Sequence, residues 1–164
     1  MENELAKPII SVKNFTAVMG GEMIIDNISF DVNEGEIFVI LGGSGCGKST
    51  LLKHMIGLIE PAAGDIEIEG QNIATATEEK KKHIQNRIGV MYQQGALFGS
   101  LNLIENVSLP LQEFTSFSHE AIHLIAHMKL QMVGLDKYAR HMPSEISGGM
   151  KKRAAIARAM ALDP

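Results

Sequence analysis

The chain has 164 residues, of which 45% are hydrophobic and 21% charged, and this composition suits a folded domain and excludes a disordered chain. Its net charge of -4 does not favour attraction to a nucleic-acid backbone, so we expect no nucleic-acid partner. A single cysteine, Cys46, excludes an internal disulfide, and the acidic N-terminus and lack of a long apolar run favour a cytoplasmic protein over a secreted or membrane-spanning one.

The first segments predict strands. Residues 9–12 and 24–32 are rich in β-branched residues and are separated by Gly20 and Gly21, which predicts an antiparallel hairpin. Residues 37–41 form a short apolar run, so we expect them to be a strand of a parallel sheet, buried on both faces.

Helices and strands are then predicted to alternate. Residues 48–58 have the apolar spacing of a helix, and residues 65–69 alternate between apolar and acidic like a half-exposed strand. Thr75 and Glu78 fit a capping box that opens a short, lysine-rich helix. Residues 88–92 predict another short buried strand.

The second half of the chain predicts helices that each begin at a polar capping residue. We expect Pro110 to disturb the end of the first helix and the second to reach Val133. The predicted caps are Asn102 with Glu105, then Ser118, then Ser147.

Histidines recur at every fourth residue of the second predicted helix, where they could in principle chelate a metal. We expect them to face solvent instead, because they lie opposite the apolar residues of the helix. A metal site is not expected, since no clustered cysteine or carboxylate completes a ligand set. The histidines are His119, His123 and His127, and the buried face is expected to hold Ala121, Ile125, Met128 and Met132.

The strongest motif lies between the predicted strand 37–41 and the predicted helix 48–58. It matches G-x-x-x-x-G-K-[ST], the P-loop, in which glycines let backbone N–H groups point at phosphate oxygens. A glycine-rich turn without a ligand is the alternative. The motif predicts that Lys48 neutralises the β- and γ-phosphates and that Ser49 binds Mg²⁺. The predicted nucleotide-binding residues are Gly42, Gly43, Ser44, Gly45, Cys46, Gly47, Lys48, Ser49 and Thr50.

A second motif narrows the class of P-loop protein. Ile146-Ser-Gly-Gly-Met150 resembles the LSGGQ signature of ABC ATPases, and it lies about a hundred residues after the P-loop, as in that family. Taken alone, Ser-Gly-Gly could be an ordinary helix cap. Between the two motifs, Tyr92-Gln93 resembles the family's Q-loop, so the resemblance covers essentially the whole chain.

The resemblance implies an α/β P-loop NTPase fold of the ABC ATPase type, with an antiparallel β-subdomain and a helical subdomain. Residues 1–97 would hold the β-subdomain and P-loop core, 98–146 the helical subdomain, and 147–164 the signature motif and its helix. The cofactors would be ATP and Mg²⁺, with the metal bound by Ser49 and Gln93. Ser147, Gly148, Gly149 and Met150 would contact the ATP held by a second copy of the subunit.

Within the family, the chain looks most like the ATPase subunit of Mla-type phospholipid transporters. That likeness implies a transmembrane permease partner and a peripheral position on the cytoplasmic face of the inner membrane. The segments that carry it are Gln94–Phe98, Asn106–Leu111, Met142–Glu145 and Ser147–Arg153, with Met150 where most of the family has glutamine.

The sequence departs from the family in two places. Met19 stands where an aromatic residue usually stacks on adenine, so we expect weaker packing and loose base selectivity. The 164 residues also lack the C-terminal core strands of the family, and with them the Walker B aspartate and the catalytic glutamate. We therefore expect no catalytic residue within the chain, weak Mg-ATP binding without turnover, and an unpaired edge at residues 37–41. A non-hydrolysing nucleotide-binding fragment and a DNA-associated ABC ATPase remain alternatives.

Overall fold

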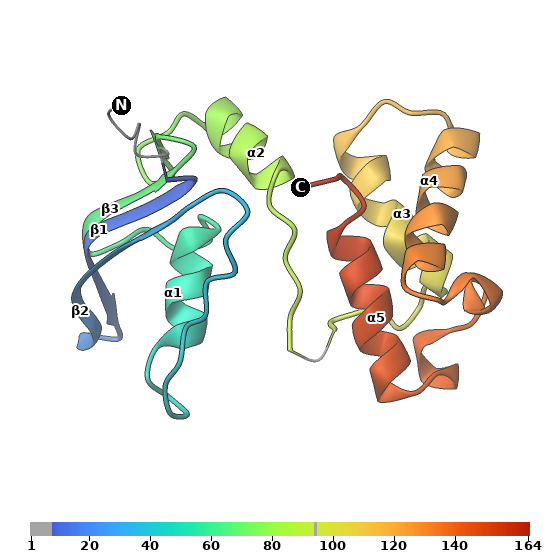
Figure 1. Cartoon of the computed structure of the whole chain (residues 1–164), viewed down its shortest axis with the longest axis horizontal. Helices are drawn as coiled ribbons and strands as arrows, with labels where there is room; N and C mark the ends of the chain where they lie inside the picture. Colours follow the sequence, from blue (N-terminus) through green and yellow to red (C-terminus); the bar gives the residue numbers. More distant parts are fainter. Residues whose placement is uncertain (1–7, 94) are drawn as a thin grey trace, which may run out of the picture. The chain divides into compact units, whose positions relative to one another are not determined.

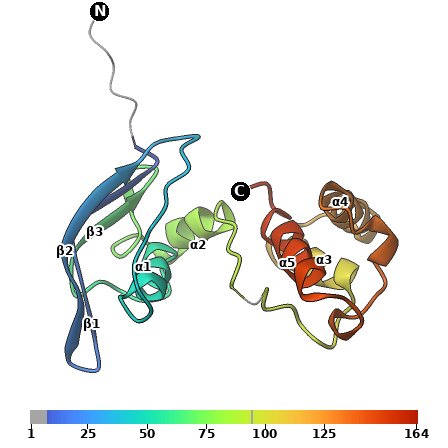
Figure 2. The same ribbon diagram turned by 60° about the horizontal axis from the view of Figure 1, so that its bottom comes forward.

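The computed structural model describes residues 8–93 and 95–164, which form two compact units (Figures 1 and 2). One unit ends at Gln85 and the other spans Asn86–Pro164. The functional division into 1–97, 98–146 and 147–164 stays a prediction, because compactness alone does not assign a function to each part.

The first unit contains a four-stranded antiparallel sheet with the order β2-β1-β3-β4. The predicted hairpin is confirmed, and its turn uses Gly20 and Gly21 at φ 60° and 86°, a conformation that costs glycine nothing. The hairpin tip extends beyond the part of β1 that pairs with β3, which ends at Thr16. The strands are β1 (Ile10–Met19), β2 (Glu22–Val32), β3 (Ala63–Ile68) and β4 (Gln71–Asn72).

Helix α1 (Lys48–Met55) packs against this sheet (Figure 1). It buries Leu51 and Met55, and the ring of its fully buried His54 meets Phe15 of β1 edge to face, with 5.1 Å between centroids. His54 Nδ1 also lies 2.7 Å from the Thr50 carbonyl, so the polar ring is satisfied within the helix. The contact fixes the last turn of α1 relative to the sheet.

The predicted lysine-rich helix forms as α2 (Glu78–Asn86), but it begins about two residues later than a cap at Thr75 implies, and the predicted cap is wrong. The Lys80 amide donates to Thr77 Oγ1 at 3.5 Å, so Thr77 sits at the start of the helix. Thr75 belongs instead to the preceding turn, in which its amide donates to Asn72 Oδ1 at 3.4 Å. An asparagine that bonds the backbone two and three residues ahead competes with helix formation at this point.

The two predicted buried strands do not form. Residues 37–41 and 88–92 have no regular structure, and Ile37 and Leu41 are 90% and 86% exposed. A strand of a parallel sheet needs backbone partners on its edges, and among the described residues the sheet contains only β1 to β4. Of the exposed segment, Phe38 alone stacks on an aromatic ring, that of Phe30, with centroids 4.9 Å apart.

The second unit is helical, and the three predicted capping residues are confirmed. Asn102 and Glu105 form a reciprocal capping box at α3, while Ser118 and Ser147 each accept a backbone N–H at 3.3 Å. Pro110 lies inside α3 and does not end it. The helices are α3 (Leu103–Phe114), α4 (His119–Met132) and α5 (Gly148–Ala159), with 3₁₀ turns at Asp136–Tyr138 and Pro143–Glu145.

A separate hydrophobic core holds these helices together. Its most buried members come from all three helices and from the turn after α4. They include Leu103, Val107, Leu130, Leu135 and Ala154. None of the helices in the described part of the chain is both long and apolar enough to cross a membrane.

The predicted buried face of α4 is wrong by about one residue. Ile122, Ala126 and Leu130 face the core, four residues apart, whereas Met128 and Met132 are 54% and 65% exposed. The packing against α3 and α5 selects this face, which the helix's many apolar residues leave undecided in the sequence. His119 and His123 are exposed and His127 is half-buried; no group of three potential metal ligands occurs among the residues described.

Candidate nucleotide-binding site

The P-loop wraps around the start of α1. Gly45 and Gly47 have φ of 83° and 93°, which other residues adopt only at a cost, and Gly47 is the N-cap of the helix. A methyl group at Gly43 or Gly45 would meet nothing within 4 Å, so this side of the loop is open. Open backbone at a helix N-terminus is the arrangement that binds anions.

Lys48 lies across the loop. Its Nζ donates to the carbonyls of Gly42 at 2.8 Å and Gly43 at 2.6 Å, and it is 3.4 Å from the sulfur of the exposed Cys46. These acceptors are weak substitutes for phosphate oxygens, since a charged acceptor makes the stronger bond with an ammonium group. The Lys48 ammonium is therefore held by the carbonyls of the loop itself.

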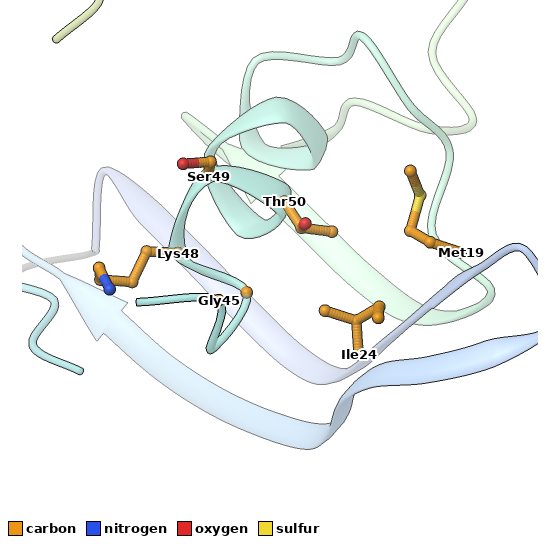
Figure 3. Close-up of a pocket in the computed structure, with 7 residues that line it drawn as sticks. Met19, Ile24, Gly45, Lys48, Ser49 and Thr50 are labelled. Atoms are coloured by element: carbon orange, nitrogen blue, oxygen red, sulfur yellow. The ribbon is translucent and has the colours of Figure 1, made fainter. Parts of the chain in front are cut away.

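A cavity of about 300 Å³ extends from this loop to the tip of the β1–β2 hairpin. Figure 3 shows Lys48 and Gly45 at one end and Met19 at the other, with Thr50 and Ile24 between them. The Lys48 end carries the positive charge and the Met19 end is apolar. Such a polarised cavity suits an anionic group joined to a less polar one. It is lined by Met19, Ile24, Gly45, Gly47, Lys48, Ser49 and Thr50.

A β-bulge places Ile24 in this cavity. Val18 pairs with Met23 and Ala17 with Ile25, so Ile24 is an extra residue in β2. The bulge brings both Ile24 and Ile25 against Gly47, where a methyl group would lie 3.1 Å and 2.9 Å from them. Ile24 could not be predicted from the sequence, because a bulge depends on pairing register rather than on residue type.

The remaining predicted residues lie in the second unit. Gln93 is exposed, in a turn closed by a 2.8 Å bond from the Gly95 amide to the Tyr92 carbonyl. Ser147, Gly148 and Gly149 are exposed at the start of α5, and Met150 packs partly against the helical core. A methyl group on either glycine would meet no atom within 4 Å. The metal role of Ser49 and Gln93 stays a prediction.

The sequence did not single out Arg158. Its guanidinium donates to the carbonyls of Gly95 at 3.0 Å and Ala96 at 2.9 Å and lies 5.9 Å from the centre of the Phe98 ring. Burial lowers the pKa of Arg158 below its ordinary value, while Tyr92 acts in the opposite direction. The one signal in the sequence is an arginine between Ala157 and Ala159, on the face of α5 that faces protein.

Comparison with known proteins places this geometry in a family. The model of the family described as "ABC transporter" matches residues 25–164, which include the P-loop, Gln93 and the signature motif. The chain belongs to the ABC transporter family. Its structure is similar to that of the ATP-binding cassette MJ0796 solved as a dimer bound to ADP and Pi, with a TM-score of 0.84 and 34% identity, covering 94% of this chain and 70% of that one.

Relatives in the ABC transporter family have names of two kinds. The chain is 44% identical to the intermembrane phospholipid transport protein MlaF of Haemophilus influenzae, covering 95% of this chain and 59% of MlaF. Against MlaF of Escherichia coli K12 the values are 41%, 100% and 61%. It is also 44% identical to a probable ribonucleotide transport ATP-binding protein of Mycobacterium leprae, covering 94% and 45%. The chain thus spans about half to three fifths of these relatives.

Proposed function

We propose that this chain is the nucleotide-binding part of an ATP-binding subunit that couples ATP to lipid transport. The observation that carries the proposal is the cavity in which Lys48, Ser49 and Thr50 lie at the start of α1. Mg-ATP fits these residues. The open glycines would hold the phosphates, Lys48 would exchange its two carbonyl acceptors for phosphate oxygens, and the Ser49 hydroxyl would ligate Mg²⁺.

Hydrolysis is a separate matter, because it needs a group that polarises water. Bound Mg²⁺ would screen the charge on the phosphates, while the residues of this chain would bind and orient the phosphates. Our proposal assigns Gln93 to the metal and Ser147 with its following glycines to the ATP held by a second copy. We propose no catalytic residue within the chain, and so expect binding without turnover.

The transported compound is proposed to be a phospholipid. The support is the MlaF name of two relatives together with the four segments, Met150 among them, that resemble the Mla-type subgroup. The ribonucleotide name of the mycobacterial relative supports a different cargo. We propose a permease as membrane partner and a position on the cytoplasmic face of the inner membrane, without a nucleic-acid partner.

The nucleotide proposal is tested by titrating the chain with a fluorescent ATP analogue in the presence of Mg²⁺. Replacing Lys48 by Ala should weaken binding at least about tenfold, since one charge-assisted contact contributes about 1.5–3 kcal/mol. Lys53→Ala, which removes an exposed lysine from the other end of α1, is the matched control and should bind like the unmodified chain. Equal affinities of all three proteins would reject the site, and steady release of phosphate would reject the claim of no turnover.

An experiment that tests which compound is transported requires the permease. Proteoliposomes containing the full-length transporter should move a fluorescent phospholipid only when Lys48 is intact. Movement of a radiolabelled ribonucleotide instead would favour the alternative cargo.

A further inference from the structure

One side chain connects two of the predicted sites in the second unit. Arg158 lies near the end of α5, whose beginning carries Ser147, and it binds the backbone just after the turn that contains Gln93. Both of its terminal nitrogens are used, one for the carbonyl of Gly95 and one for that of Ala96. A planar guanidinium can hold two acceptors at fixed positions, which a lysine ammonium cannot do equally well.

The backbone that Arg158 holds has an unfavourable conformation. Gly95 and Ala96 have φ of 79° and 45°, and the left-handed region costs a residue with a Cβ, such as Ala96. Such a conformation persists only when its surroundings hold it in place. The two bonds from Arg158 and the Phe98 ring beside the cation are that support.

The backbone at two glycines, Gly89 and Gly95 on either side of Gln93, lies directly on α5. A methyl group at Gly95 would be 3.2 Å from the Lys151 carbonyl, and one at Gly89 would be 2.5 Å from the Ala159 carbonyl. The backbone on either side of Gln93 therefore contacts α5 near both ends of the helix. Close backbone packing of this kind transmits a displacement of the helix to the segment.

A second arginine of the same helix provides a comparison. Arg153 Nη1 donates to the Val133 carbonyl at 2.8 Å, just after α4. It thus makes the same type of bond from the same helix, but to a loop that holds no predicted site residue.

We propose that Arg158 is a positioning residue, which fixes the Gln93 turn to α5 so that Gln93 and the Ser147 end of the helix move as one body. The proposal rests on the proposed function only for the roles of Gln93 and Ser147. A change at the ATP contacted by Ser147 would thereby reach the turn that presents Gln93.

Hydrogen exchange of the 164-residue chain, followed by mass spectrometry, tests the positioning directly. Arg158→Ala should raise the exchange rate of amides in 92–98 at least about tenfold, while amides of α3 and α4 keep theirs. Arg158→Lys should give exchange rates at 92–98 between those of the unmodified chain and of Arg158→Ala, because one ammonium group cannot hold both carbonyls in the way that the planar guanidinium does. Arg153→Ala, the matched control, should speed exchange at 133–135 and leave 92–98 unchanged.

Three outcomes would overturn the proposal: unchanged exchange at 92–98 in Arg158→Ala, an equal rise over all the helices, or the same rise at 92–98 in Arg153→Ala. The equal rise would mean that Arg158 only stabilises the fold. If Arg158→Ala does not fold, Arg158→Lys carries the test with the same criteria.

A spectroscopic measurement adds an independent readout. A nitroxide on Gln93→Cys, in a Cys46→Ser background, should become more mobile when Arg158 is replaced by Lys, but not when Arg153 is; an unchanged spectrum would overturn the proposal. Neither experiment uses nucleotide, so a failed ATP titration would reject the proposed function and leave the positioning intact.

Discussion

Replacing Asn106 by Leu should destabilise the helical unit strongly. Asn106 is completely buried in α3, where its Oδ1 accepts the Phe98 amide at 2.8 Å and its Nδ2 donates to the carbonyls of Phe98, Leu101 and Asn102. Leucine has a similar volume and can make none of these bonds. The variant therefore isolates the loss of hydrogen bonding from the loss of packing.

The magnitude follows from the groups that lose every partner. The Phe98 carbonyl still accepts from the Leu101 amide, and the Asn102 carbonyl from the Asn106 amide. The Phe98 amide and the Leu101 carbonyl are left unpaired. Both bonds are part-buried, which places the cost in the lower part of the range of about 1–3 kcal/mol for each unsatisfied group. We therefore expect a total loss of roughly 3 kcal/mol, a large part of the about 5–15 kcal/mol by which domains are stable.

Urea unfolding followed by circular dichroism at 222 nm measures this loss. With m of about 1–2 kcal/mol/M, the midpoint should fall by roughly 1.5–3 M. Ser108→Ala is the control: Ser108 is buried in the same helix, but its hydroxyl donates to an Ile104 carbonyl that the helix already satisfies. That change should cost at most about 1 kcal/mol. Equal midpoints for Asn106→Leu and the unmodified chain would show that the Asn106 hydrogen bonds do not stabilise the unit.

Three further predictions concern the nucleotide cavity. Saturating Mg-ATP should slow alkylation of the exposed Cys46 several-fold, because the phosphates would cover the loop that carries it, and unchanged kinetics would count against this. ATP and GTP should compete for the site with affinities within about threefold, and Met19→Tyr should tighten ATP binding several-fold through stacking; strong selectivity in the unmodified chain would be the opposite result. Gly47→Ala should weaken nucleotide binding about tenfold, since its φ of 93° costs alanine about 1–2 kcal/mol and its methyl would press on Ile25; an unchanged affinity for the fluorescent ATP analogue would contradict it.

Features with a local cause could be predicted from the sequence. The caps at Asn102, Ser118 and Ser147 depend on a side chain and a backbone N–H three residues away, so the sequence contains both partners. The hairpin and the start of the P-loop helix likewise depend on glycines in the left-handed region.

Features that depend on residues far away in the sequence could not be predicted from it. Residues 37–41 have the composition of a buried strand, but a strand exists only through its neighbours, and none pairs with them in the described sheet. The buried face of α4 is set by α3 and α5, which favour Ile122 over Met128. The role of Arg158 could not be predicted for the same reason, because its acceptors lie more than sixty residues away in the sequence.

The exposed segment 37–41 has a consequence for how tightly nucleotide can bind. The P-loop follows it directly, so the loop is anchored on its C-terminal side, by α1 and by the contact of Gly47 with Ile25, and not through strand pairing on its N-terminal side. If ligand binding orders these residues, each costs about 1–2 kcal/mol of conformational entropy, which is subtracted from the intrinsic affinity. A partner that paired with this segment in advance would raise the affinity for ATP without touching the ligand.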